Sequence, residues 1–533
     1  MIYKRFSEKL RSILKEFKDY SFLFKFITLL IVFFSFLRIP LALISPVTGD
    51  AGKHAMIIRG VATGDIPIPI LWSFQDVFFM KEEVLLSNPP LFYIISTVFY
   101  KIGGFFGYGL AFAKMVSPLC SILLIYLTFL FGKKISKEVG LFSAFIASVI
   151  PYNIVMGSVL YRNMLFALLF ILVIYYLAKL DKYKENRFVI VSGVLLGLLL
   201  LSKKQAPIIF PFLLYVGYKS NIKKKVFYST LIGVIIALPM FIRNLVMFKK
   251  PIVIRTLATK TASFPSSSLF DFSITSIRNF YVGYLEMWGV PAGDLGTAFG
   301  YINNYLFDEL AFFLTVGWVV ITAICSLIFV MGYKEYRISS YQNRFLKYLE
   351  VSSLILILML VYLTFFKPQL PKYRHILPIS VLFSICGAII LSKIRKGKNM
   401  LSPNKNVAIL LIVIVLFLSL TMVPIFKPII AKEDVSRYDE AINWIKDNAE
   451  EGETIINPFS TYVSYKTKTT SIWSTDLSDI NSILRQNTSN IIFLPKQYEK
   501  QENMDKIKEG LRDFSSLKTV YEDQNSIIYK YIG

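Results

Sequence analysis

The sequence predicts a polytopic α-helical membrane protein with about 11–13 transmembrane helices and a small α/β domain at its C-terminal end. Two observations carry this prediction. Hydrophobic residues make up 55% of the 533 positions, and the mean hydropathy is +0.55. Apolar runs of roughly 18 residues, the length that crosses the hydrocarbon layer as a helix, recur along most of the chain. Runs of this length are helical, because only a helix lets a single segment in lipid hydrogen-bond all of its own backbone N–H and C=O groups.

The apolar runs and their charged flanks place the predicted spans along the chain. They lie near residues 22–46, 108–132, 138–156, 163–180, 187–202, 205–219, 225–246, 307–332, 349–366, 373–393 and 405–426. The apolar segment 89–103 is short and ends at glycine, so we expect it to lie as a helix at the outer interface.

The formal net charge of +24 lies mostly in short connectors between the spans. Lysine and arginine in short loops mark the cytoplasmic side of a membrane protein. With a cytoplasmic N-terminus, alternation of the spans places all of these basic connectors on one side. The connectors contain Lys133, Lys134 and Lys137; Lys182, Lys184 and Arg187; Lys219 and Lys223 to Lys225; Lys334, Arg337, Arg344 and Lys347; and Lys393, Arg395, Lys396 and Lys398. A nucleic-acid-binding protein would instead gather its charge on one soluble face, so nucleic acid is not an expected partner.

The same topology divides the chain into three parts. Residues 1–21 form a cytoplasmic segment, 22–426 the transmembrane domain, and 427–533 an extracytoplasmic domain. Within the transmembrane domain, the loops 47–107 and 247–306 face outward. Protein localisation is therefore predicted to be the cell membrane, with membrane lipids as partners.

The last hundred residues differ in composition from the rest. An apolar stripe at Tyr438, Ala441, Ile442 and Ile445 predicts an amphipathic helix over 434–448. Strand-like runs follow at 454–457, 490–494 and 526–531, with a further helical stretch near 497–512.

An acidic residue follows the first span. Asp50 precedes a helical segment that places His54 one turn later, at i+4. A carboxylate at this position can accept a proton from a hydroxyl group, which is the role of a general base. The alternative is that Asp50 only caps the helix that begins near Ala51.

Three basic residues occur at span ends on the predicted outer side. Lys203 lies in the turn 201–205, Arg243 near the end of the span 225–246, and Arg374 at the start of the span 373–393. A guanidinium group suits phosphate oxygens, and a lysine turn suits a phosphate cradle. The alternatives are snorkelling and interfacial anchoring. The predicted topology brings these residues, Asp50 and both histidines, His54 and His375, to one membrane face.

These residues stand in motifs that resemble those of the GT-C superfamily of polyprenyl-phosphate-dependent glycosyltransferases. The resemblance is to the family 39 group of protein O-mannosyltransferases and the lipid A aminoarabinose transferase, and it covers roughly residues 20–400. The motifs occur in the family's order: Asp50 to Gly64-Asp65, Asn88-Pro89-Pro90-Leu91-Phe92-Tyr93, Gly197 to Lys203, Pro239 to Asn244, and Tyr373-Arg374 to Pro378.

The resemblance implies transfer of a sugar from a polyprenyl- or dolichyl-phosphate donor to a lipid, glycan or protein acceptor on the outer face, with inversion. It implies that Asp50 is the catalytic base, that Lys203, Arg243 and Arg374 bind the donor phosphate, and that His54, Asn163, Tyr373 and His375 orient the substrates. The alternatives are a non-enzymatic transporter or flippase for lipid-linked glycans, and an envelope polysaccharide polymerase.

The chain departs from the family pattern at two positions. Ala51 follows Asp50 where the family often has glutamate, and Asn163 stands where members commonly have a second acidic residue. An amide cannot act as a base or as a charged metal ligand, so Asn163 cannot supply a second carboxylate. The alternative is that one of Asp65, Asp76, Glu82 and Glu83 replaces it. No cofactor or metal is predicted, since cationic side chains can supply the positive charge, although a divalent metal is compatible with the mechanism.

Overall fold

A computed structural model describes most of the predicted transmembrane domain and parts of the C-terminal domain. The described residues are 22–45, 49–64, 89–248, 328–365, 377–396, 439–450, 453–457, 470–473, 490–495, 517–523 and 526–531. The predicted span 405–426, most of the span 307–332 and the helical stretch near 497–512 lie outside these residues.

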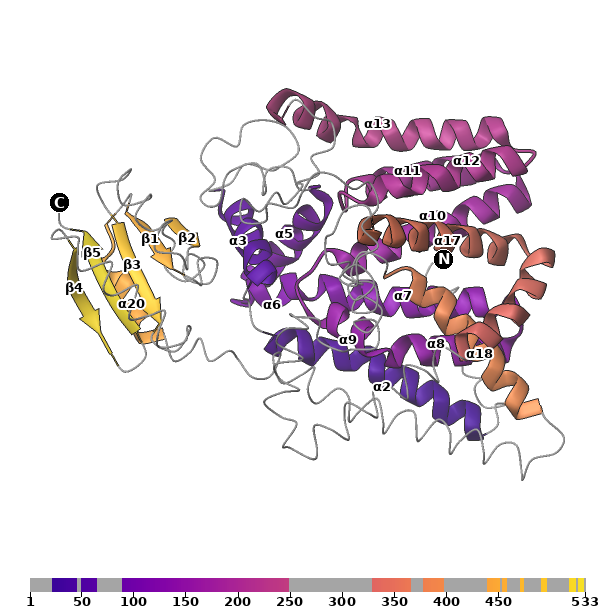
Figure 1. The fold of residues 1–533 in the computed structure, drawn as a ribbon, viewed down its shortest axis with the longest axis horizontal. Helices are drawn as coiled ribbons and strands as arrows, with labels where there is room; N and C mark the ends of the chain where they lie inside the picture. Colours follow the sequence, from indigo (N-terminus) through magenta and orange to yellow (C-terminus); the bar gives the residue numbers. More distant parts are fainter. Residues whose placement is uncertain are drawn as a thin grey trace.

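The described N-terminal and central parts form a bundle of apolar helices, several of which run side by side in Figure 1. Among the described residues, four helical segments are long and apolar enough to cross a membrane: Phe22–Ile44, Gly109–Gly132, Asn163–Tyr183 and Lys223–Leu245. The prediction of a polytopic helical protein is therefore confirmed. The helices are α2 (Phe22–Ile44), α3 (Gly49–Thr63), α5 (Leu91–Gly104), α6 (Gly109–Lys114), α7 (Val116–Gly132), α8 (Lys137–Val149), α9 (Pro151–Ser158), α10 (Asn163–Tyr183), α11 (Asn186–Leu200), α12 (Ile209–Lys219), α13 (Lys223–Phe248), α17 (Arg344–Phe365) and α18 (Ile379–Lys396).

One predicted span is broken in the structure. The segment 138–156 forms two helices, α8 and α9, because Pro151 has no backbone N–H to continue the hydrogen bonds of α8. The carbonyl of Ala147, which would accept that bond, instead accepts one from Asn153 Nδ2 at 3.3 Å. The next carbonyl, that of Ser148, accepts a hydrogen bond from Arg38 of α2 at 2.9 Å. Two side chains thus replace the bonds at the break.

Close contact between α11 and α13 depends on glycine. A Cβ added at Gly197 would lie 2.6 Å from Ile236 Cβ, and one added at Gly193 would lie 2.8 Å from the backbone oxygen of Ser229. Ser192 and Ser229 share a hydrogen bond at 2.8 Å across the same interface. Small residues four positions apart let membrane helices approach closely, so Gly193 and Gly197 fix where α13 lies against α11.

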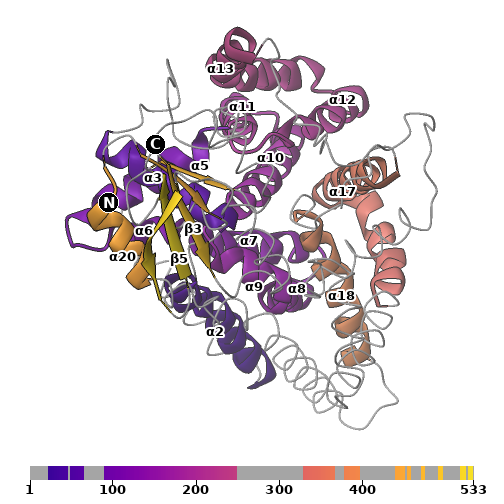
Figure 2. The ribbon, with the colours of Figure 1, turned by 60° about the vertical axis from the view of Figure 1, so that its left-hand side comes forward.

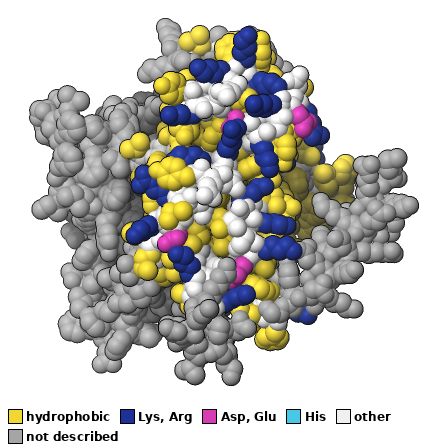
Figure 3. Space-filling model, turned by 90° about the vertical axis from the view of Figure 1, so that its right-hand side faces the viewer, with side chains coloured by type: hydrophobic (Ala, Val, Ile, Leu, Met, Phe, Trp, Pro, Cys, Tyr) yellow, Lys and Arg dark blue, Asp and Glu magenta, His cyan; other side chains and the backbone are white. Residues whose placement is uncertain are grey.

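The basic connectors gather at one end of the bundle. Ion pairs join them across helices: Arg344 with Asp181 at 2.6 Å, Lys393 with Glu335 at 2.7 Å, and Arg395 with Glu138 at 3.2 Å. Figure 3 shows this face with many Lys and Arg side chains and few acidic ones. The prediction that these connectors share one side is confirmed for the residues that the structure describes, and we call this end the basic face. Figure 2 shows α18 beside α8, with α17 next to α18.

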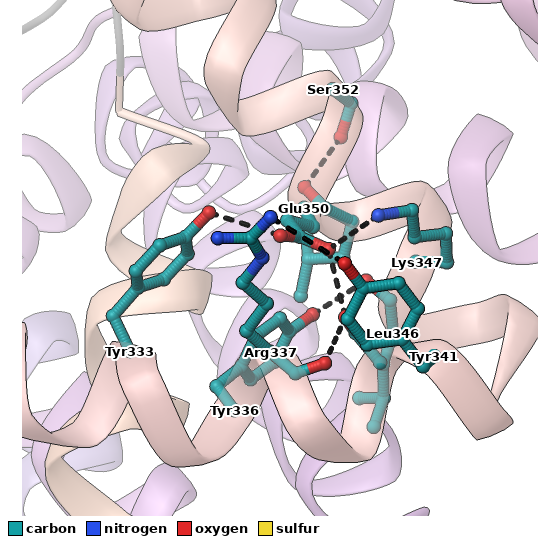
Figure 4. Close-up of polar contacts among 10 residues, drawn as sticks. Tyr333, Tyr336, Arg337, Tyr341, Leu346, Lys347, Glu350 and Ser352 are labelled. Atoms are coloured by element: carbon teal, nitrogen blue, oxygen red, sulfur yellow. Dashed lines mark hydrogen bonds and ion pairs between the residues drawn. The ribbon is translucent and has the colours of Figure 1, made fainter.

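A buried carboxylate joins the helical residues 328–342 to α17 at this end. Glu350 is 3% exposed and accepts hydrogen bonds from Tyr333 at 3.0 Å and Ser340 at 2.8 Å. It also pairs with Lys347 at 3.1 Å (Figure 4). Tyr336 donates to the carbonyl of Leu346 at 2.6 Å in the same network. Because each polar group has a partner, the two segments are held at a fixed angle.

The C-terminal part contains a five-stranded sheet with the order β2-β1-β3-β5-β4. Its strands are β1 (Thr454–Asn457), β2 (Thr470–Trp473), β3 (Asn490–Pro495), β4 (Leu517–Glu522) and β5 (Ser526–Tyr531). β1 pairs in parallel with β2 and β3, whereas β5 is antiparallel to both β3 and β4. Helix α20 (Asp439–Asn448) packs Ala441, Ile442 and Ile445 against this sheet. The prediction of a small α/β region is confirmed.

Replacing Gly197 with valine tests the α11–α13 contact. The added side chain overlaps Ile236 and should lower stability by about 1–3 kcal/mol through overpacking. A Cβ at Gly217 of α12 meets nothing within 4 Å, so Gly217→Val is the matched control. Thermal unfolding of the purified chain in detergent should show a lower melting temperature for the first variant only. Equal melting temperatures would contradict the close contact.

Candidate functional site

Helix α3 carries the two N-terminal candidates. Asp50 lies in the first turn of α3 and His54 one turn later, as predicted. The side chain of Asp50 lies outside the described residues. At the end of α2, the buried Lys114 donates to the carbonyls of Leu43 at 3.2 Å and Ser45 at 2.6 Å. A lysine that caps the last carbonyls of a helix stabilises that end.

His54 is 7% exposed and lies in an aromatic setting. Its Nδ1 is 3.0 Å from the hydroxyl of Tyr93 on α5. The ring of Tyr161 packs edge-on at 5.9 Å between centroids, and that of Phe92 at 5.5 Å. The hydrogen bond at Nδ1 fixes the orientation of the imidazole, so Nε2 has a defined direction.

The connector between α9 and α10 places Tyr161 and Asn163. The hydroxyl of Ser117 on α7 donates to the carbonyl of Tyr161 at 3.0 Å and accepts from its backbone N–H at 3.3 Å. Asn163 begins α10, is buried, and has its Nδ2 3.6 Å from the sulfur of Met156. The predicted orienting residue therefore lies next to the ring that contacts His54.

Lys203 lies in the turn after α11 and is 2% exposed. Its Nζ is 5.1 Å from the centre of the Phe166 ring. Phe166 lies one turn after Asn163 in α10. The backbone N–H of Leu91 donates to the carbonyl of Leu201 at 3.0 Å, which joins this turn to the start of α5. A buried ammonium group can hold a negatively charged group through charge-assisted hydrogen bonds. The structure brings Lys203, Asn163 and His54 to one end of the bundle.

Arg243 reaches the same end from α13. Gly193 lies against Ile232 and Gly197 against Ile236, so a step of four residues along α11 matches a step of four residues along α13. The two helices therefore run in the same direction. Arg243 lies seven residues beyond Ile236, and Lys203 six beyond Gly197. The guanidinium is mostly buried and donates to Oδ1 of Asn244 from Nη2 at 2.9 Å and from Nε at 3.3 Å.

The remaining candidates, Tyr373, Arg374 and His375, lie outside the described residues. They precede α18, whose far end pairs with the start of α8 through Arg395 and Glu138 at the basic face. Helix α18 therefore begins at the opposite end of the bundle, which is the end that carries His54 and Lys203.

Two kinds of residue near this site escaped prediction. Tyr93 stands in a recognised motif and Tyr161 two residues before Asn163, but which residue each would contact is not evident from the sequence. Arg38 is 0% exposed within α2 and, besides the carbonyl of Ser148, bonds that of Phe34. An arginine inside an apolar run is a signal that could have found it, because a charge at that depth needs internal partners. Among the described residues, no group of three or more His, Cys, Asp or Glu side chains forms a metal site.

Comparison with known proteins gives one family match and several similar folds. The family model of dolichyl-phosphate-mannose-protein mannosyltransferases matches residues 87–246, which hold α5 to α13. No curated protein matches the chain by sequence. ArnT from Cupriavidus metallidurans, in the apo state, is similar in structure with a TM-score of 0.61 at 11% identity; the match covers 94% of this chain and 97% of ArnT.

Two further solved structures contain lipid phosphates. ArnT from the same organism bound to undecaprenyl phosphate matches with a TM-score of 0.56 at 11% identity, over 94% of this chain and 97% of that one. The archaeal oligosaccharyltransferase AglB from Archaeoglobus fulgidus, in complex with an inhibitory peptide and a dolichol-phosphate, matches with a TM-score of 0.53 at 13% identity, over 96% of this chain and 74% of AglB. The chain therefore shares the fold of these proteins, and the resemblance to the family 39 group that its motifs indicate is confirmed.

Proposed function

We propose that this protein is a membrane glycosyltransferase that moves a sugar from a polyprenyl- or dolichyl-phosphate donor to an acceptor at the extracytoplasmic face. The observation that carries the proposal is a buried lysine, Lys203, at the same end of the bundle as His54 and the first turn of α3. The basic face lies at the other end, and short basic connectors favour the cytoplasm. This orientation directs the site outward.

The relatives indicate the class of donor. One structure of ArnT holds undecaprenyl phosphate, and the AglB structure holds a dolichol-phosphate. In this chain, the cations of Lys203 and Arg243, joined by Arg374, are the groups that suit a phosphate diester. Their charge stabilises the phosphate as it leaves with the electron pair of the broken bond.

The proposed reaction is a direct displacement. The acceptor hydroxyl gives its proton to the carboxylate of Asp50 while its oxygen forms a bond to the anomeric carbon. The bond between that carbon and the phosphate oxygen breaks at the same time, so the anomeric centre inverts. His54, held by Tyr93, orients the acceptor or the sugar, with Asn163, Tyr373 and His375 in supporting positions. Asn163 has no carboxylate and does not act as a second base, and no metal is required because the cations supply positive charge.

Membranes that contain the protein test the activity directly. They are incubated with polyprenyl-phosphate sugars labelled in the sugar, and the label is followed into acceptor fractions. Transfer of the label to an acceptor supports the proposal. Movement of the intact donor across vesicles without cleavage would instead assign the chain to lipid-linked glycan carriers.

Replacing Asp50 with asparagine should remove the base and keep the size of the side chain. We expect transfer to fall by about 100-fold or more, since general base catalysis contributes that much. Initial rates are measured at saturating donor, and expression and melting temperature serve as controls for folding. An Asp50→Asn protein with full activity would remove this residue from the mechanism.

Replacing Lys203 with methionine should weaken donor binding by about tenfold or more, because a charge-assisted contact to phosphate is lost. The melting temperature of each variant is measured as a control for folding. Lys101→Met is the matched control, because Lys101 is exposed at the end of α5. The measurement is the affinity for polyprenyl phosphate by native mass spectrometry. Unchanged affinity in the Lys203 variant would contradict the assignment.

A further inference from the structure

Four lysines gather on the basic face, far from the candidate site. Lys133 and Lys134 lie in the connector after α7, and Lys179 and Lys182 lie in the last turns of α10. We call them the lysine cluster. Burial lowers the pKa of Lys134, and the positive charges of Lys182, Lys179 and Lys133 lower it further. Three ammonium groups thus act on that of Lys134, although a nearby tyrosine, Tyr183, opposes part of this effect on its pKa.

The carboxylates of the basic face are paired with other residues. Among the described residues, Glu138, Asp181 and Glu350 pair with Arg395, Arg344 and Lys347. Glu185 also forms an ion pair with Arg187, and Glu335 forms one with Lys393. Within the described part of the chain, these carboxylates form their ion pairs with cations outside the lysine cluster, which leaves the charge of the cluster to attract an anion.

Aromatic rings hold the cluster in place. Lys134 lies 4.4 Å from the ring centre of Phe345, and Lys179 lies 4.9 Å from those of both Tyr175 and Tyr176. Lys182 lies 5.2 Å from the ring of Tyr183. Cation–π contacts orient an ammonium group without neutralising it. Each lysine keeps N–H donors for oxygen atoms, so the cluster is suited to phosphate.

The surface of α7 below the cluster is apolar and exposed. Leu119 is 39% exposed, Leu123 52% and Tyr126 53%. These positions and Lys133 follow one another at helical spacing, so they lie on one side of α7. A strip that is apolar along its length and basic at its end matches the chemistry of a phospholipid, with acyl chains beside a phosphate.

We propose that the lysine cluster binds the phosphate headgroup of an anionic phospholipid, whose acyl chains lie against the exposed strip of α7. The site lies at the opposite end of the bundle from Lys203, so it is separate from the proposed donor site. Basic pockets between transmembrane helices near the cytoplasmic surface suit such headgroups. The occupant is a membrane lipid because the apolar strip of α7 leads directly to Lys133 at the end of that helix.

Native mass spectrometry of the full chain tests the proposal. The purified protein is titrated with phosphatidylglycerol and with phosphatidylcholine of the same acyl chains. The cluster variant carries Lys133→Gln, Lys134→Gln and Lys182→Gln, and the control carries Lys219→Gln, Lys223→Gln and Lys224→Gln, which are three exposed lysines of the same face. We expect about tenfold weaker binding of phosphatidylglycerol to the cluster variant and little change in the control.

Each outcome decides the matter. Equal affinity of the two variants for phosphatidylglycerol, or equal binding of both lipids to the unaltered chain, would overturn the site. Saturation of the cluster by inorganic phosphate that displaces the lipid would reassign it to a soluble phosphate compound and overturn the lipid assignment. If the glutamine variant does not fold, a variant with arginine at the same three positions should retain the lipid, and loss of binding there would contradict the proposal. We expect the affinity for the polyprenyl-phosphate donor at Lys203 to be the same in all of these variants.

Discussion

The hydrocarbon layer cannot solvate a polar group, and this constraint shapes every part of the bundle. A helix broken at Pro151 leaves the carbonyls of Ala147 and Ser148 without backbone partners, and the side chains of Asn153 and Arg38 bond them. Arg38 in turn has its charge enclosed by helices α2, α8 and α9. Gly157 allows this approach, since a Cβ there would lie 3.1 Å from Arg38 Cδ. The break is therefore stable, and it directs the chain into the connector that carries Tyr161.

The same constraint concentrates charge at the two ends of the bundle, and each end has its own chemistry. At the basic face, carboxylates and cations from four connectors join helices that are distant in sequence, as Arg344 and Asp181 do for α17 and α10. At the other end, the buried cations Lys203 and Arg243 lie at the same end of the bundle as a histidine and tyrosines. One end holds helices together and faces lipid headgroups, whereas the other is suited to a negatively charged substrate.

Sequence periodicity predicted most helices, because long apolar runs have one stable conformation in lipid. It also predicted α20 and three strands of the sheet. It missed the break at Pro151, where the apolar pattern continues across a change of direction, and the short strands β2 and β4, whose sequences lack a clear alternation. For the site, charge and position at span ends indicated Lys203 and Arg243. The contacts of His54 with Tyr93 and Tyr161 depend on how α3, α5 and the α9–α10 connector pack, which no local pattern encodes.

The account depends on distant helix ends meeting at one surface of the membrane, opposite the basic face. Single cysteines at positions 50, 374 and 224 test this in a chain whose three native cysteines are replaced by serine. The variants Asp50→Cys, Arg374→Cys and Lys224→Cys are treated in intact cells with a maleimide that does not cross membranes. We expect positions 50 and 374 to react from outside, and position 224 to react only after the cells are opened. Labelling of positions 50 and 374 from opposite sides would contradict the account.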